Sequence, residues 1–110
     1  MKLPHGEQAF IDLAKLRDYS LSGSHPEGKH KARVFAATRG LDHRDADWLR
    51  DALLSAAITQ DCRMGIQTDF GQRFVADFQV RRGVLEARIR SAWIIRTNEN
   101  FPRLTTCYVL

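Results

Sequence analysis

The sequence has few cysteines and no long apolar run. Cys62 and Cys107 lie far apart, match no metal-ligand spacing and do not suggest a disulfide framework. No apolar stretch approaches the roughly 20 residues needed to span a bilayer, and the amino terminus lacks the apolar centre of a signal peptide. We therefore expect a reduced, cytoplasmic protein that does not contact a membrane.

The sequence patterns of well-known catalytic sites are missing as well. We find no zinc-ligand, P-loop, dinucleotide-binding or catalytic-triad pattern. Asp42, Asp45, Asp47 and Asp51 resemble an acidic metal cluster, but Asp47 and Asp51 fall on the solvent stripe of a predicted helix. We therefore expect neither a bound metal nor a cofactor.

The composition is that of an ordinary soluble globular chain. The 110 residues are 44% hydrophobic and 27% charged, which predicts a single domain over residues 1–110. There is no repeat, linker or low-complexity segment. The formal net charge of +4 suits an anionic partner without requiring one.

The first half of the chain predicts helices. Asp12 can cap a short helix over residues 13–21, and the capping-box spacing of Ser24 and Glu27 predicts a second helix from about residue 26 to Arg39. The clearest helical pattern covers residues 42–60. Its core-facing positions are Ala46, Leu49, Leu53 and Ala56, and its polar stripe is Asp47, Asp51 and Ser55.

The second half of the chain alternates as strands do. Residues 73–80 and 84–96 predict a hairpin, and residues 104–110 predict a final strand that is central in the sheet or lines a site. This order predicts an α+β fold, in which N-terminal helices pack on one face of an antiparallel sheet of three to four strands.

The stretch SHPEGKHKARVF, residues 24–35, places basic side chains at a predicted helix start. Lys29 and Arg33 are neighbours on one helix face, where like charges repel unless an anion lies between them. Alternatively, these side chains point into water and are screened by salt. The positive helix end favours the neutral form of His25, which suits a general base, although His25 can also simply cap the helix.

The predicted sheet offers a second basic surface. Arg88, Arg90 and Arg96 alternate with buried-type residues, so they can line one face and bind a phosphate backbone, or form an ordinary solvated face with Glu86 and Asp77. Trp93 and Tyr108 are aromatic and can stack on bases, but aromatic residues in strands more often belong to the core. Thr105 and Thr106 are expected on opposite faces, so that only one reaches a site.

The whole chain resembles a bacterial family catalogued as a domain of unknown function. The resemblance rests on LPHGEQAFIDLAKLRDYSLS, HPEGKHKARVF, GQRFVADF, RSAWIIR and FPRLTTCYV. Members of that family occur as small free-standing proteins and as terminal modules of polymorphic toxins. The toxin setting is similar to that of the barnase/EndoU/colicin/RelE-type ribonucleases, a fold-level analogy. The resemblance marks His25, Lys31, Arg90 and Thr105 or Thr106 as motif members without assigning their roles.

Together these patterns lead to the hypothesis of a metal-independent, toxin-type endoribonuclease. In this hypothesis a 2′-hydroxyl attacks the adjacent phosphate, His25 moves the proton, and Lys31 and Arg90 stabilise the developing charge, with Thr105 as a further catalytic residue. The expected substrate-binding residues are Lys29, Arg33, Arg73, Arg88 and Thr106. The expected partners are RNA and an acidic antitoxin or immunity protein. The alternative is a non-catalytic module that binds RNA or protein through the same basic surface.

Overall fold

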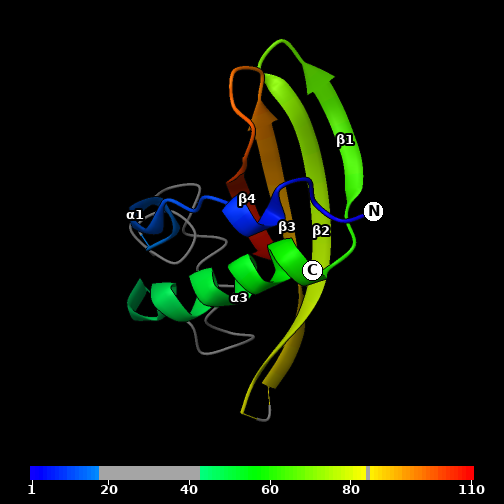
Figure 1. Ribbon diagram of the computed structural model, residues 1–110. Helices are drawn as coiled ribbons and strands as arrows, with labels where there is room; N and C mark the ends of the chain where they lie inside the picture. Colours follow the sequence, from blue (N-terminus) through cyan, green and yellow to red (C-terminus); the bar gives the residue numbers. More distant parts are fainter. Residues whose placement is uncertain (18–42, 84) are drawn as a thin grey trace.

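The computed structural model describes residues 1–17, 43–83 and 85–110. Figure 1 shows an antiparallel sheet with one long helix packed across it. The helical elements and strands are η1 (Gly6–Gln8), α1 (Leu13–Lys15), η3 (His43–Asp45), α3 (Ala46–Thr59), β1 (Arg63–Thr68), β2 (Gly71–Arg82), β3 (Leu85–Arg96) and β4 (Pro102–Val109). None of the helices in these ranges is long and apolar enough to cross a membrane.

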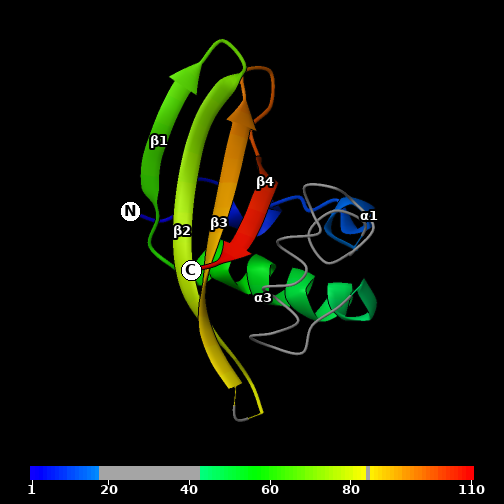
Figure 2. The same ribbon diagram turned by 180° about the vertical axis from the view of Figure 1, so that it is seen from behind.

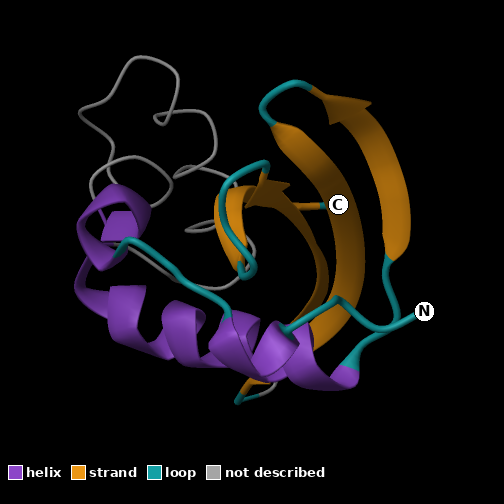
Figure 3. Ribbon diagram, turned by 45° about the horizontal axis from the view of Figure 1, so that its top comes forward, coloured by secondary structure: helices purple, strands orange, loops and turns teal. Residues whose placement is uncertain are grey.

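The four strands form a meander in the order β1-β2-β3-β4. The predicted hairpin is confirmed as β2 and β3, which pair antiparallel along their whole length from Gly71 opposite Arg96 to Arg82 opposite Leu85. Gly83, in the turn between them, has a φ of 63°, a left-handed conformation that glycine adopts without strain. Both strands are long and the sheet is strongly curved (Figure 3).

The helix predicted over residues 42–60 is confirmed as α3, preceded by the short turn η3. Its predicted core positions are all buried, with Leu49 and Leu53 completely removed from solvent. They pack against Phe78 and Ile89 of the sheet, so α3 covers the concave face (Figure 3). This packing follows from the apolar stripe that recurs every three to four residues.

The predicted fold class is wrong. The described residues form mainly a four-stranded antiparallel sheet, and the long helix α3 lies in the middle of the chain rather than in a group of N-terminal helices. Before α1, the N-terminal segment contains only the short 3-10 helix η1, and Phe10 pairs with the edge of β4 through its backbone. The Phe10 N–H donates to the Pro102 carbonyl at 2.9 Å, and the Leu104 N–H donates to the Phe10 carbonyl at 3.0 Å.

The edges of the sheet differ from the prediction in two further ways. The C-terminal strand β4 is an edge strand of the described sheet, not a central one, although it does line a pocket. At the other edge, β1 was not predicted at all. All its residues are exposed, so it carries no alternation of buried and exposed positions.

Several predictions fall outside the described residues. They are the helix from about residue 26 to Arg39, its capping box, the last four residues of the helix predicted over residues 13–21, and the site residues His25, Lys29, Lys31 and Arg33. The predicted cap of the short helix is confirmed, because the Asp12 carboxylate accepts a hydrogen bond from the Lys15 backbone N–H at 3.2 Å.

Candidate functional site

The convex face of the sheet, on the side away from α3, is rich in arginine. Figure 2 shows this side with the strands in front and α3 behind them. Cross-strand partners share a face, and the register of the sheet therefore places one set of arginines together. This arginine face consists of Arg63, Arg73, Arg81, Arg88, Arg90, Arg96 and Arg103, with Asp77 and Glu86 as the acids on the same strands.

Arg90 is fixed in the middle of this face by Asp77. Its Nε and Nη2 donate to the two carboxylate oxygens of Asp77 at 2.8 and 2.9 Å, and Arg63 approaches the same carboxylate at 3.5 Å. The Asp77 side chain is only 11% exposed. The hydrogen bonds from Arg90 lower the pKa of Asp77, and those from Arg90 to Asp77 and Tyr108 raise the pKa of Arg90. Arg90 and Asp77 thus form a structural ion pair, and Arg90 is not a free cation.

Other arginines on the same face are available to a ligand. Arg73 and Arg88 are exposed, and neither has an ion-pair partner among the described residues. The acids are already engaged, because Asp77 binds Arg90, and Glu86 binds Arg81 and accepts a hydrogen bond from Gln79 at 3.2 Å. The arginine face therefore presents excess positive charge to solvent.

A β-bulge changes the alternation in β4. Ala92 pairs with Thr106 but Trp93 pairs with Leu104, which leaves Thr105 as an extra residue in β4. The Thr105 hydroxyl donates to the Ala92 carbonyl at 3.0 Å. The bulge brings Arg103 onto the arginine face opposite Ile94, and Thr106 stays on that face opposite Ala92. Thr105 and Thr106 were predicted on opposite faces because successive residues of a regular strand alternate. The bulge at Thr105 interrupts that alternation.

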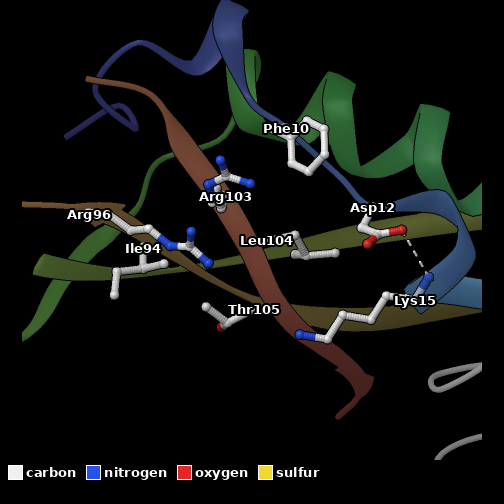
Figure 4. A pocket seen from close by; sticks show the side chains of 8 residues that line it. All are labelled: Phe10, Asp12, Lys15, Ile94, Arg96, Arg103, Leu104 and Thr105. Atoms are coloured by element: carbon white, nitrogen blue, oxygen red, sulfur yellow. Dashed lines mark hydrogen bonds between the residues drawn. The ribbon is translucent and has the colours of Figure 1, made fainter. Parts of the chain in front are cut away.

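A pocket of about 140 Å³ lies at the end of the arginine face, between the N-terminal segment and the strands β3 and β4. The side chains of Lys15 and Arg96 reach toward Thr105 from α1 and from β3 (Figure 4). The other residues that line the pocket are Phe10, Asp12, Ile94, Arg103 and Leu104. The pocket thus combines cationic side chains with an apolar wall.

The wall beside the N-terminal segment is built around Arg103. Its guanidinium lies over two aromatic rings, 4.9 Å from the centroid of Phe10 and 5.0 Å from that of Phe101. It also donates to both carboxylate oxygens of Glu99, at 2.8 and 2.7 Å. These hydrogen bonds lower the pKa of Glu99 and raise that of Arg103, which keeps the pair ionised.

The structure brings some of the sequence-predicted site residues together. Arg73, Arg88, Arg90 and Thr106 share the arginine face, and Thr105 lies in the pocket at its end. His25, Lys29, Lys31 and Arg33 are outside the described residues. Of the two aromatic candidates, Trp93 is completely buried and belongs to the core, whereas Tyr108 lies opposite Arg90 on the arginine face.

Sequence reasoning missed the pocket residues Phe10, Lys15 and Arg103. Phe10 and Arg103 meet only because the N-terminal segment pairs with the edge of β4, a contact between positions far apart in the chain. The segment FPRLTTCYV contains Arg103 and is one of the segments on which the family resemblance rests. It was the signal in the sequence that could have pointed to Arg103.

A family model described as "Domain of unknown function (DUF6883)" matches residues 2–110. The chain belongs to this family. The match confirms that the sequence patterns belong to a domain-of-unknown-function family and that the resemblance extends over nearly the whole chain. No match was found among curated proteins or among solved structures. A proposal for this DUF6883 member therefore depends on the geometry of its arginine face and pocket.

Proposed function

We propose that the protein binds RNA, with the phosphate backbone lying across the arginine face. The observation that carries this proposal is the pair of exposed arginines, Arg73 and Arg88, which lie on adjacent strands without an ion-pair partner among the described residues. Guanidinium groups match phosphate oxygens in geometry and stay charged at any physiological pH.

The architecture of the face supports binding to an extended strand. The arginines at positions 88, 90 and 96 all project from one strand, where alternate residues are roughly 6.7 Å apart. Asp77 pairs with the central Arg90, and the exposed Arg73 and Arg88 lie on either side of this rigid ion pair. Tyr108, on the same face, is an aromatic side chain on which a base can stack.

The experiment is a measurement of the affinity for a short single-stranded RNA at several salt concentrations. Arg88→Gln and Arg73→Gln should each weaken binding severalfold and reduce the slope of log K against log salt by about 0.7. Arg50→Gln is the matched control, because Arg50 is an arginine of α3, away from the sheet face, paired with Asp47 and Asp51. Equal effects of all three variants, or no RNA binding at low salt, would contradict the proposal.

A metal-independent endoribonuclease of toxin type is a second candidate. The observation that favours it is the bulge at Thr105, since bulges often occur beside active sites, where they redirect a side chain. In this candidate His25 is the general base, Lys31 and Arg90 stabilise charge, and an acidic antitoxin or immunity protein covers the basic surface. RNA cleavage that survives EDTA and is lost in a folded His25→Ala variant would support it. Binding without cleavage would contradict the endoribonuclease candidate and support the RNA-binding proposal.

A further inference from the structure

The pocket at the end of the arginine face holds two cations that are poorly neutralised. Within the described part of the chain, the Lys15 ammonium has no ion-pair partner. Among the described acids, the nearest to Arg96 is Glu99 at 4.0 Å, and that carboxylate already accepts both hydrogen bonds from Arg103. Lys15 and Arg96 are thus the groups that an incoming anion would meet.

Among the described residues, the two acids near the pocket are Asp12 and Glu99, and neither forms an ion pair with Lys15. Asp12 caps α1 through the Lys15 backbone N–H, so one of its oxygens is directed at the main chain (Figure 4). Glu99 is only 17% exposed and is held by Arg103. The Thr105 hydroxyl donates to the Ala92 carbonyl, and its oxygen remains able to accept a hydrogen bond.

The size and lining of the pocket restrict the ligand. A volume of about 140 Å³ is well below the several hundred Å³ of pockets that enclose drug-sized molecules. It suits a compact anionic group, while Phe10, 46% exposed, offers part of an aromatic ring to whatever is attached to that group. A phosphate monoester carries about −1.5 to −2 charges at pH 7 and so suits two cations better than an internal diester with one charge.

We propose that this pocket binds a phosphate monoester, carried by the end of the RNA strand that lies on the arginine face. The inference rests on the proposed RNA binding and adds the part of the strand that is recognised. Arg96 belongs both to the pocket and to the arginine face, so a strand that starts in the pocket can continue along β3 and β4. The same chemistry is available from free phosphate, and the test separates these two sources.

The experiment compares two RNA oligonucleotides that differ only in a 5′-phosphate or a 5′-hydroxyl. The wild-type protein should bind the phosphorylated strand roughly tenfold more tightly, as expected when charge-assisted hydrogen bonds to a dianion are added. Lys15→Gln should abolish most of this preference. The control is Arg88→Gln, which should weaken binding of both oligonucleotides by the same factor and leave their ratio unchanged.

A second oligonucleotide pair, with a 3′-phosphate or a 3′-hydroxyl, determines which end is recognised. If RNA binds but neither phosphate changes its affinity, or if Lys15→Gln keeps the preference, the pocket inference is overturned while the RNA-binding proposal stands. If no RNA binds, the RNA-binding proposal fails, and with it the assignment of the phosphate to a strand end.

An NMR titration with inorganic phosphate tests free phosphate as the source. Saturable shifts of the Thr105 and Arg96 amide signals, absent in Lys15→Gln, would support a phosphate site independently of RNA. Adenosine 5′-monophosphate that binds more tightly than inorganic phosphate would support a site for an esterified phosphate beside Phe10. The absence of saturable shifts with either compound would overturn the site.

Discussion

On the α3 side of the sheet, the central side chains of β2 and β3 are almost completely removed from water, whereas their immediate neighbours in the sequence form the arginine face. Ile89 and Ser91 are fully buried on the α3 side, and Arg88 and Arg90 alternate with them on the other. A strand places successive side chains on opposite faces, so one segment serves both purposes. The buried face determines stability, and the arginine face is available for binding.

The largest expected effect compares two adjacent residues of β3. Ile89→Ala removes a fully buried side chain from the cluster that α3 covers and should lower the free energy of unfolding by about 2 to 5 kcal/mol. Arg88→Ala should change it by no more than about 0.5 kcal/mol. Urea denaturation of both variants measures the difference. Equal losses of unfolding free energy in the two variants would show that the buried face does not contribute more to stability than the arginine face.

The next prediction concerns Ser91, a buried polar residue on the α3 side of the sheet. The Ser91 hydroxyl donates to the Ala76 carbonyl at 2.7 Å and accepts from the Trp93 indole at 2.9 Å. Ser91→Ala leaves the buried indole N–H without this acceptor and should lower the free energy of unfolding by about 1 to 3 kcal/mol. Ser55→Ala, an exposed position on α3, is the matched control and should be nearly neutral. A neutral Ser91→Ala would mean that the indole finds another partner.

Asp77, on the arginine face, makes a smaller and pH-dependent contribution to the free energy of unfolding. Its hydrogen bonds with Arg90 lower its pKa in the folded protein, so it binds protons more weakly there than in the unfolded chain. Its stabilisation is therefore complete above the unfolded pKa of about 3.9 and is lost as the pH falls through the lower folded value. Asp77→Asn should lower the free energy of unfolding by about 1 to 2 kcal/mol at pH 7.

The difference between wild type and Asp77→Asn should shrink when denaturation is measured at pH 4, 3 and 2.5. A difference that stays constant from pH 7 to pH 2.5 would show that packing, not the charge of Asp77, is responsible for the loss. RNA binding at pH 7 provides an independent check. It should not weaken in Asp77→Asn, because the substitution removes a negative charge from the arginine face.

Local patterns predicted the central part of the fold. The stripe of Leu49 and Leu53 specified α3, and the alternation over residues 73–80 and 84–96 specified the β2–β3 hairpin, with Asp77 and Arg90 on one face. In these segments one face is buried, so the apolar period follows directly from the secondary structure. The arginine face could be anticipated for the same reason, since its residues alternate with the core.

The sheet edges could not be predicted by the same reasoning. In the six-residue strand β1, the apolar Met64 and Ile66 are 61% and 72% exposed, so the strand buries no face that would give its sequence a clear pattern. Its register also shifts between Met64 and Gln67. The bulge at Thr105 and the pairing of Phe10 with β4 depend on contacts between distant segments. The bulge and this pairing build the pocket, so local periodicity in the sequence could not predict the residues that line it.

The smallest expected effect separates two arginine–acid pairs on the arginine face. Arg81 and Glu86 are 72% and 41% exposed near the end of the hairpin, whereas Asp77 is 11% exposed beneath Arg90. Water and salt screen an exposed pair, and ordering two long side chains offsets most of what remains. Glu86→Gln should therefore lower the free energy of unfolding by no more than about 0.5 kcal/mol, and this loss should vanish in 1 M salt.

Asp77→Asn should retain most of its effect in the same buffer, because salt screens partly buried charges less. Urea denaturation of both variants at low and high salt makes the comparison. A loss above about 1 kcal/mol for Glu86→Gln that persists in 1 M salt would mean that the hairpin end is as rigidly held as the centre of the sheet, and that exposure does not distinguish the structural arginines from those free to bind phosphate.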